Sequence, residues 1–200
     1  MDVSSVEGLA IATYERLGFD PSEPVSTFKL ARAILGPNAI ERSSLAGAVA
    51  STFVINGERR IGLSRKLAPE YAAFCIGHEL GHIICQEQGF RGPRLEQVCD
   101  QIAAALMAPA PAVAAFVRAG VTHEELADEV VATQTWAALR LAEVLSIPRA
   151  VVTPARVYVR GPEDFRWPLS VRKLVGKDIP GVRKTRLSDD PERVVLDVVG

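Results

Sequence analysis

Apolar residues recur at helical spacing through most of the first 150 residues of the chain. The spacing over residues 6–17, followed by Gly18, predicts an amphipathic helix. A second, shorter helix is expected over residues 28–35, before Gly36 and Pro37. Proline, glycine or a capping residue bounds each of the later helices, which are expected over 69–89, 94–107, 111–120, 122–131 and 136–145.

Two parts of the chain have the pattern of strands instead. Residues 47–55 are small or β-branched, and Asn56-Gly57 separates them from a second run at 59–64. Asn-Gly between two such runs predicts a hairpin, because both turn residues adopt positive φ. We expect the second strand, 59–64, to be an exposed sheet edge. Valine-rich runs at 151–152, 157–159 and 194–199 predict further strands.

These elements predict an α+β fold. A mainly helical domain with a small antiparallel sheet is expected over residues 1–121. A helix pair of helix-turn-helix length follows at 122–149, and a β-containing tail at 150–200 completes the chain. Seven basic residues and one acidic residue lie between Arg166 and Arg186. That local excess can meet an acidic protein or a nucleic acid, although a solvated basic face is the simpler interpretation.

Composition narrows the class of protein. Apolar residues make up 48% of the chain and charged residues 24%, which is ordinary for a globular domain, and the net charge of −1 does not favour nucleic acid as a partner of the whole chain. No apolar run approaches the roughly 18 residues needed to cross a membrane. The first residues lack the basic start and apolar stretch of a secretory signal. Three cysteines without a framework spacing suggest reduced thiols, so we expect a cytoplasmic protein without a membrane partner.

His78-Glu79-Leu80-Gly81-His82 lies on the helix expected at 69–89. Residues four apart on a helix are offset by about 40°, so both imidazoles can bind one metal ion. Zinc accepts such nitrogen ligands, and Glu79 lies about 100° round the helix, where it can hold a water that the metal activates. The motif is short, and two surface histidines beside an acid remain the alternative.

A third ligand is expected from the following helix. Glu96 and Asp100 are four residues apart, hence on one face, and the helix has an apolar side for burial. Glu96 can reach the metal as a ligand. Asp100 can accept the free ring N–H of a ligating histidine and so fix its tautomer. The alternative for Glu96 is a solvated acid favoured by the helix dipole.

Other side chains near the motif fit less well. His123 occurs in the capping box Thr122-His123-Glu124-Glu125, where a solvated helix start is expected. Glu87 lies nine residues after His78 and therefore points to the opposite face of the helix. Cys85 shares the histidine face, which leaves a His-His-Cys site open, although a small buried residue is the expected role. Tyr71 is on the same face, where it could donate to a developing oxyanion, although packing in the core is the expected role.

The stretch HELGHIIC, followed by LEQVCDQIAAALMAP, resembles the ImmA/IrrE family of metallopeptidases. That family typically has HELGH and then E-x-x-A-(N/D)-x-F-A-A-x-L-L-M-P. Glu96 matches the ligand glutamate, Asp100 the Asn/Asp position and Pro109 the closing proline, and the match covers residues 78–109. The departures are mild packing changes at Cys99, Ile102, Met107 and Ala108.

The resemblance implies a zincin-like, zinc-dependent endopeptidase that cleaves a cytosolic protein partner, often a helix-turn-helix repressor. The leading hypothesis therefore has His78, His82 and Glu96 as Zn²⁺ ligands, Glu79 as general base and Asp100 behind a histidine ligand. The alternative is a regulator that binds DNA or a repressor without cleaving it and holds a structural metal. An open metal position would favour the first hypothesis, and four protein ligands, Cys85 among them, would favour the second.

Overall fold

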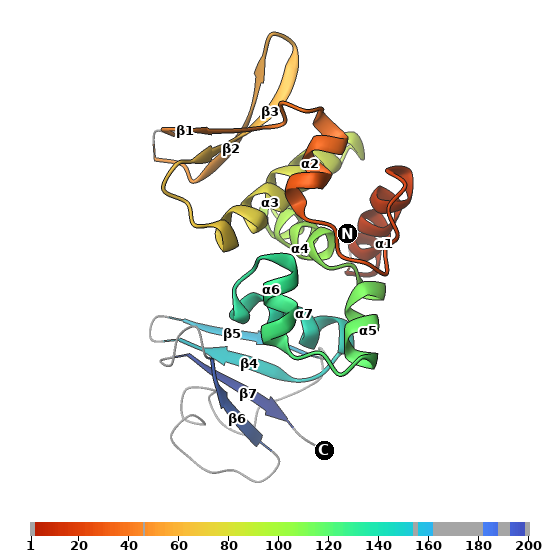
Figure 1. The fold of residues 1–200 in the computed structure, drawn as a ribbon, viewed down its shortest axis with the longest axis vertical. Helices are drawn as coiled ribbons and strands as arrows, with labels where there is room; N and C mark the ends of the chain where they lie inside the picture. Colours follow the sequence, from red (N-terminus) through yellow and green to blue (C-terminus); the bar gives the residue numbers. More distant parts are fainter. Residues whose placement is uncertain (1–2, 46, 154–155, 162–181, 188–192, 199–200) are drawn as a thin grey trace. The chain divides into compact units, whose positions relative to one another are not determined.

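The computed structural model describes residues 3–45, 47–153, 156–161, 182–187 and 193–198. The chain divides into two compact units (Figure 1). Unit 1 comprises Met1–Ala119 with Asp128–Ala132, and unit 2 comprises Gly120–Ala127 with Thr133–Gly200. Both units contain helices and strands. The predicted α+β class is therefore confirmed.

Unit 1 is built around helices that begin and end close to the positions the sequence predicts. Ser26 caps one of them by accepting a hydrogen bond from the backbone N–H of Lys29, and Pro69 occupies the first turn of another. The helices are α1 (Val3–Arg16), α2 (Thr27–Leu35), α3 (Pro69–Glu87), α4 (Leu95–Met107) and α5 (Ala110–Arg118).

The sheet of unit 1 has three strands, in the order β1 (Ile40–Ser43), β3 (Glu58–Ser64) and β2 (Ala50–Ile55). The predicted hairpin is present, because β2 pairs antiparallel with β3 and Asn56 and Gly57 have φ values of 52° and 81°. The expectation that 59–64 is a sheet edge is wrong. The short strand β1, which was not predicted, pairs parallel with β3 on its other side, so β3 is central and β2 is the edge.

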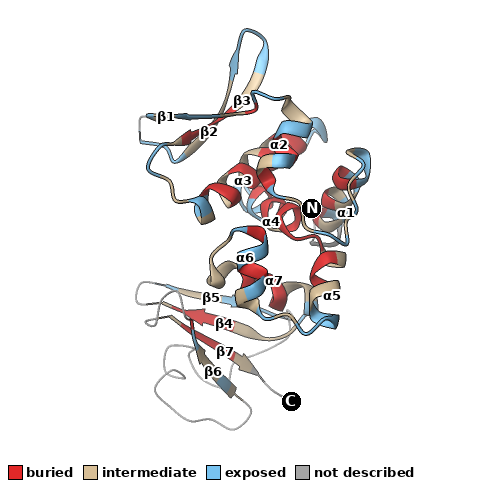
Figure 2. Cartoon of the chain, in the orientation of Figure 1, coloured by how far each residue is buried: buried red, intermediate tan, exposed pale blue. Residues whose placement is uncertain are grey.

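The core of unit 1 forms where α3 and α4 pack against each other and against α1, α2 and β3 (Figure 2). A hydrogen bond crosses this core: the buried hydroxyl of Tyr14 in α1 donates to the carbonyl of Leu106 in α4 at 2.8 Å. Burial raises the pKa of Tyr14 to about 12, so this hydroxyl stays a donor at neutral pH. Among the described helices, none is by itself both long and apolar enough to cross a membrane, and only α4 and α5 together, bent by 46°, pass that test.

Unit 2 combines helices with a four-stranded antiparallel sheet. Helix α6 (His123–Val130) begins in unit 2, and its last residues are counted in unit 1. The capping box predicted at its start is present, since Thr122 and Glu125 bond each other's backbone N–H groups at 2.8 and 3.2 Å. Helix α7 (Gln134–Leu145) packs on the sheet through Ala138. The strand order is β5 (Val157–Arg160), β4 (Arg149–Val152), β7 (Val194–Val198) and β6 (Val182–Arg186). The division into parts at 1–121, 122–149 and 150–200 stays a prediction.

The basic segment 166–186 falls mostly outside the described residues. Its described end is strand β6, which the sequence did not predict and which lies at an edge of the sheet. Arg183 and Arg186 are exposed there.

Candidate metal centre

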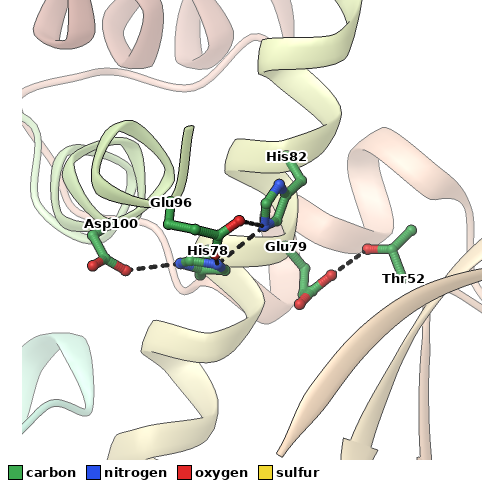
Figure 3. Close-up of polar contacts among 6 residues, drawn as sticks. All are labelled: Thr52, His78, Glu79, His82, Glu96 and Asp100. Carbon is green, nitrogen blue, oxygen red and sulfur yellow. Dashed lines mark hydrogen bonds and ion pairs between the residues drawn. The ribbon is translucent and has the colours of Figure 1, made fainter. Parts of the chain in front are cut away.

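Two histidines of α3 face one another across a single turn of the helix. The Nε2 atoms of His78 and His82 are 3.1 Å apart, and the side chains are 21% and 30% exposed (Figure 3). Both rings stand on the side of α3 that α4 approaches. Their nitrogens are therefore partly shielded from water yet still accessible.

Helix α4 places a carboxylate against both rings. The oxygens of Glu96 lie 3.3 Å from His78 Nε2 and 3.5 Å from His82 Nε2. One ligand atom from each of the three residues falls within 4.8 Å of the others. Two imidazole nitrogens and one carboxylate oxygen are a donor set that suits Zn²⁺, so the side chains fit the metal that the sequence motif implies.

A second carboxylate of α4 orients one of the histidines. Asp100 Oδ1 lies 2.8 Å from His78 Nδ1. When Nδ1 carries the proton of this bond, Nε2 keeps a lone pair toward His82 and Glu96, which is the tautomer that a metal ligand needs. The hydrogen bond with Asp100 also raises the pKa of His78, against the opposing effect of partial burial.

The carboxylate of Glu79 lies outside this group of three ligands. It accepts a hydrogen bond of 2.6 Å from the hydroxyl of Thr52, which reaches it from strand β2 (Figure 3). Glu79 is adjacent to His78 in the chain. It therefore stands beside the candidate ligands without being one of them.

The close approach of α3 and α4 depends on small residues that the histidine motif alone does not mark as important. A Cβ atom added to Gly77 would lie 3.1 Å from Ala103, and one added to Gly81 would lie 3.0 Å from the backbone of Cys99. Gly77 and Gly81 are four residues apart, and so are Cys99 and Ala103, so each pair forms one face of its helix. The glycine inside the histidine motif thus lets α4 bring its carboxylates within reach of α3.

This contact predicts a cost for Gly81→Ala. Alanine favours a helix over glycine by about 0.5–1 kcal/mol, but overpacking a tight contact costs typically about 1–3 kcal/mol. We expect net destabilisation of about 1 kcal/mol, measured by denaturant unfolding, together with weaker metal binding as Glu96 shifts. The matched control is Gly8→Ala in α1, where an added Cβ meets nothing within 4 Å. It should stabilise the protein by roughly 0.5–1 kcal/mol. Equal stabilisation by both changes would contradict the steric argument.

The remaining sequence candidates lie elsewhere. Cys85 is fully buried, outside the group that can hold a metal, and burial raises the pKa of its thiol. Glu87 pairs with Arg16 of α1 at 3.7 Å. His123 begins α6 in unit 2. The expectation that Tyr71 packs in the core is wrong, because it is 48% exposed. It lies in the first turn of α3, where a helix face is only partly covered.

The chain is similar to known proteins in both sequence and fold. A family model described as "Peptidase_M78: IrrE N-terminal-like domain" matches residues 34–153, a range that includes the histidine motif, Glu96 and Asp100. Among solved structures, a "Mycobacterium tuberculosis transcriptional regulator" has a similar fold. Its TM-score is 0.64 at 12% sequence identity, with 96% of this chain and 86% of that chain covered. No significant match is found among curated protein sequences.

Proposed function

Because the chain belongs to the Peptidase_M78 family, we propose that it is a zinc-dependent metallo-endopeptidase that acts on a cytosolic protein partner. The observation that carries this proposal is the convergence of His78, His82 and Glu96, with Glu79 beside them. Three protein ligands leave a fourth position of tetrahedral zinc open, as catalytic sites require. All three cysteines are free, which fits a reducing cytosol.

In this proposal each residue of the site has a separate role. His78, His82 and Glu96 hold the metal, and Asp100 keeps His78 in the tautomer that presents Nε2. A zinc ion held there would supply Lewis acidity, which lowers the pKa of water toward neutral and polarises a carbonyl. Glu79 takes the proton of the attacking water on a carboxylate oxygen and delivers it to the leaving nitrogen.

The edge strand β2 is the surface on which we propose the substrate binds. An exposed edge can accept an extended peptide as an added strand, whose main chain then pairs whatever its sequence. Strand β2 is the edge beside α3, because Thr52 contacts Glu79. Val54 of this strand is 65% exposed and offers an apolar contact to such a peptide.

A helix-turn-helix repressor is the partner we propose, as the resemblance to the ImmA/IrrE family implies. The second candidate function is a regulator that binds a repressor or DNA without cleavage and uses the metal only structurally. It is favoured by the exposed Arg183 and Arg186 on the edge strand β6, which can meet an acidic protein surface or phosphate. The three-ligand site supports the peptidase more strongly.

One experiment separates the two functions. The purified protein is expected to contain about one zinc per chain by elemental analysis and to cleave the helix-turn-helix repressor encoded beside its gene. Removing the metal with a chelator should abolish cleavage, and added Zn²⁺ should restore it. Binding of that repressor without cleavage, in protein whose zinc content is verified, would favour the regulator instead.

A further inference from the structure

The bond between Thr52 and Glu79 joins the edge strand to the proposed base. Thr52 Oγ1 donates to Glu79 Oε2 at 2.6 Å, across 27 residues of sequence. A hydroxyl donor this close to a carboxylate is typical of a charge-assisted bond, which is roughly twice as strong as a neutral one. Figure 3 shows Thr52 reaching from its strand to the carboxylate on α3.

Thr52 is a polar residue on an apolar face of the sheet. In the antiparallel pairing of β2 and β3, Thr52 lies opposite Ile61, and Ala50 lies opposite Leu63. Ile61 and Leu63 are fully buried in the core of unit 1, and Ala50 packs against that core. An apolar side chain would satisfy packing at position 52. Packing of the strand therefore does not require a hydroxyl at this position, whereas the hydrogen bond to Glu79 does.

The bond also limits what the carboxylate can do. A glutamate side chain has three rotatable bonds, and holding one oxygen removes most of that freedom. Thr52 takes one lone pair of Oε2, so Oε1 is the oxygen that keeps both lone pairs for the attacking water. Preorganisation of this kind lowers the barrier because the base needs no reorientation at the moment of reaction.

We propose that Thr52 is a positioning residue that holds Glu79 for catalysis and couples its position to the edge strand that receives the peptide. This inference rests on the proposed peptidase function. Alternate residues of an edge strand direct their N–H and C=O groups outward, so an added peptide would pair at Thr52 or at its immediate neighbours. Substrate binding would then steady the same strand that holds the base.

The test compares three threonine variants. Thr52→Val keeps the shape but loses the hydroxyl, and we expect kcat to fall about 10- to 100-fold, the equivalent of one hydrogen bond to a charged group, with KM and zinc content unchanged. Thr52→Ser restores the donor and should stay within a few fold of wild type. The matched control is Thr27→Val. Its hydroxyl bonds the carbonyl of Ala73 at 2.8 Å, on the same helix as Glu79 and six residues before it. It should lower stability and leave kcat unchanged.

A second measurement does not depend on activity. The free energy of unfolding of the metal-free protein is measured with denaturant. Thr52→Val should lower it more in the wild-type background than in the Glu79→Ala background, where the hydrogen bond between the two residues is already lost. A wild-type kcat in Thr52→Val would overturn the inference while the peptidase function stands. Additive stability effects would overturn it as well. If the wild-type protein cleaves no repressor, the proposed function fails, and this inference fails with it.

Discussion

If Glu79 is the general base, as proposed, Glu79→Gln is expected to lower kcat for cleavage of the proposed repressor substrate by about 10²–10⁴-fold, while fold and zinc content stay at the wild-type level. Glutamine keeps the shape of the side chain and can still accept the hydrogen bond from Thr52, which lies at 2.6 Å from the carboxylate. It cannot take up a proton. Because Glu79 is not among the three side chains that can hold the metal, its replacement should affect turnover and not metal binding.

The comparison variant is His82→Ala, which should lose both zinc and activity. Glu79→Gln should also capture the intact repressor, since the binding surfaces are unchanged, and this complex can be isolated by co-purification. Cleavage by Glu79→Gln at the wild-type rate would refute the general-base role. Capture of repressor by both wild type and variant, with cleavage by neither, would favour the regulator.

Glu96→Ala is expected to lose most of the bound zinc. Glu96 carries the only carboxylate in the group of three candidate ligands found among the described residues. Loss of even an outer-shell partner typically weakens metal affinity about 10–100-fold, so loss of a ligand should cost at least that much. Zinc content after dialysis, measured by elemental analysis, tests this, with circular dichroism as the check on folding.

Glu87→Ala is the matched control for that change. Glu87 is also an exposed helical glutamate, but its ion pair is with Arg16 of α1 at 3.7 Å. Exposed ion pairs contribute typically 0–1 kcal/mol, so Glu87→Ala should keep both zinc and stability close to wild type. Equal zinc content in the two variants would remove Glu96 from the ligand set.

Local patterns in the sequence were sufficient for the helices and the hairpin. Pro69 at the start of α3, the capping box at Thr122 and the Asn56-Gly57 turn act within a few residues, and each is present in the structure. Helical spacing also placed His78 and His82 on one face before any tertiary information. Their identity as candidate ligands, like that of Glu96, follows from residue type and spacing.

Features that depend on pairing between distant segments were not predictable in this way. Strand β1 is only four residues long, and its partner β3 comes after β2 in the chain. Because this pairing joins segments that are not consecutive, no local pattern predicts that β3 is the central strand. Tyr71 has the helix face of a core residue, but it lies in the first turn of α3 and is 48% exposed in the described part of the chain. Thr52 is an ordinary strand residue until α3 brings Glu79 to its hydroxyl.

The sequence by itself determined which residues carry the candidate chemistry and which helices bear them, because motif spacing and capping are properties of a few consecutive residues. Only the tertiary structure decided how those helices meet. The contacts at Gly77 and Gly81 bring α4 close to α3, and Glu96 and Asp100 reach His78 only through that approach. Distances between side chains on two helices depend on packing across the whole core, which no local pattern encodes.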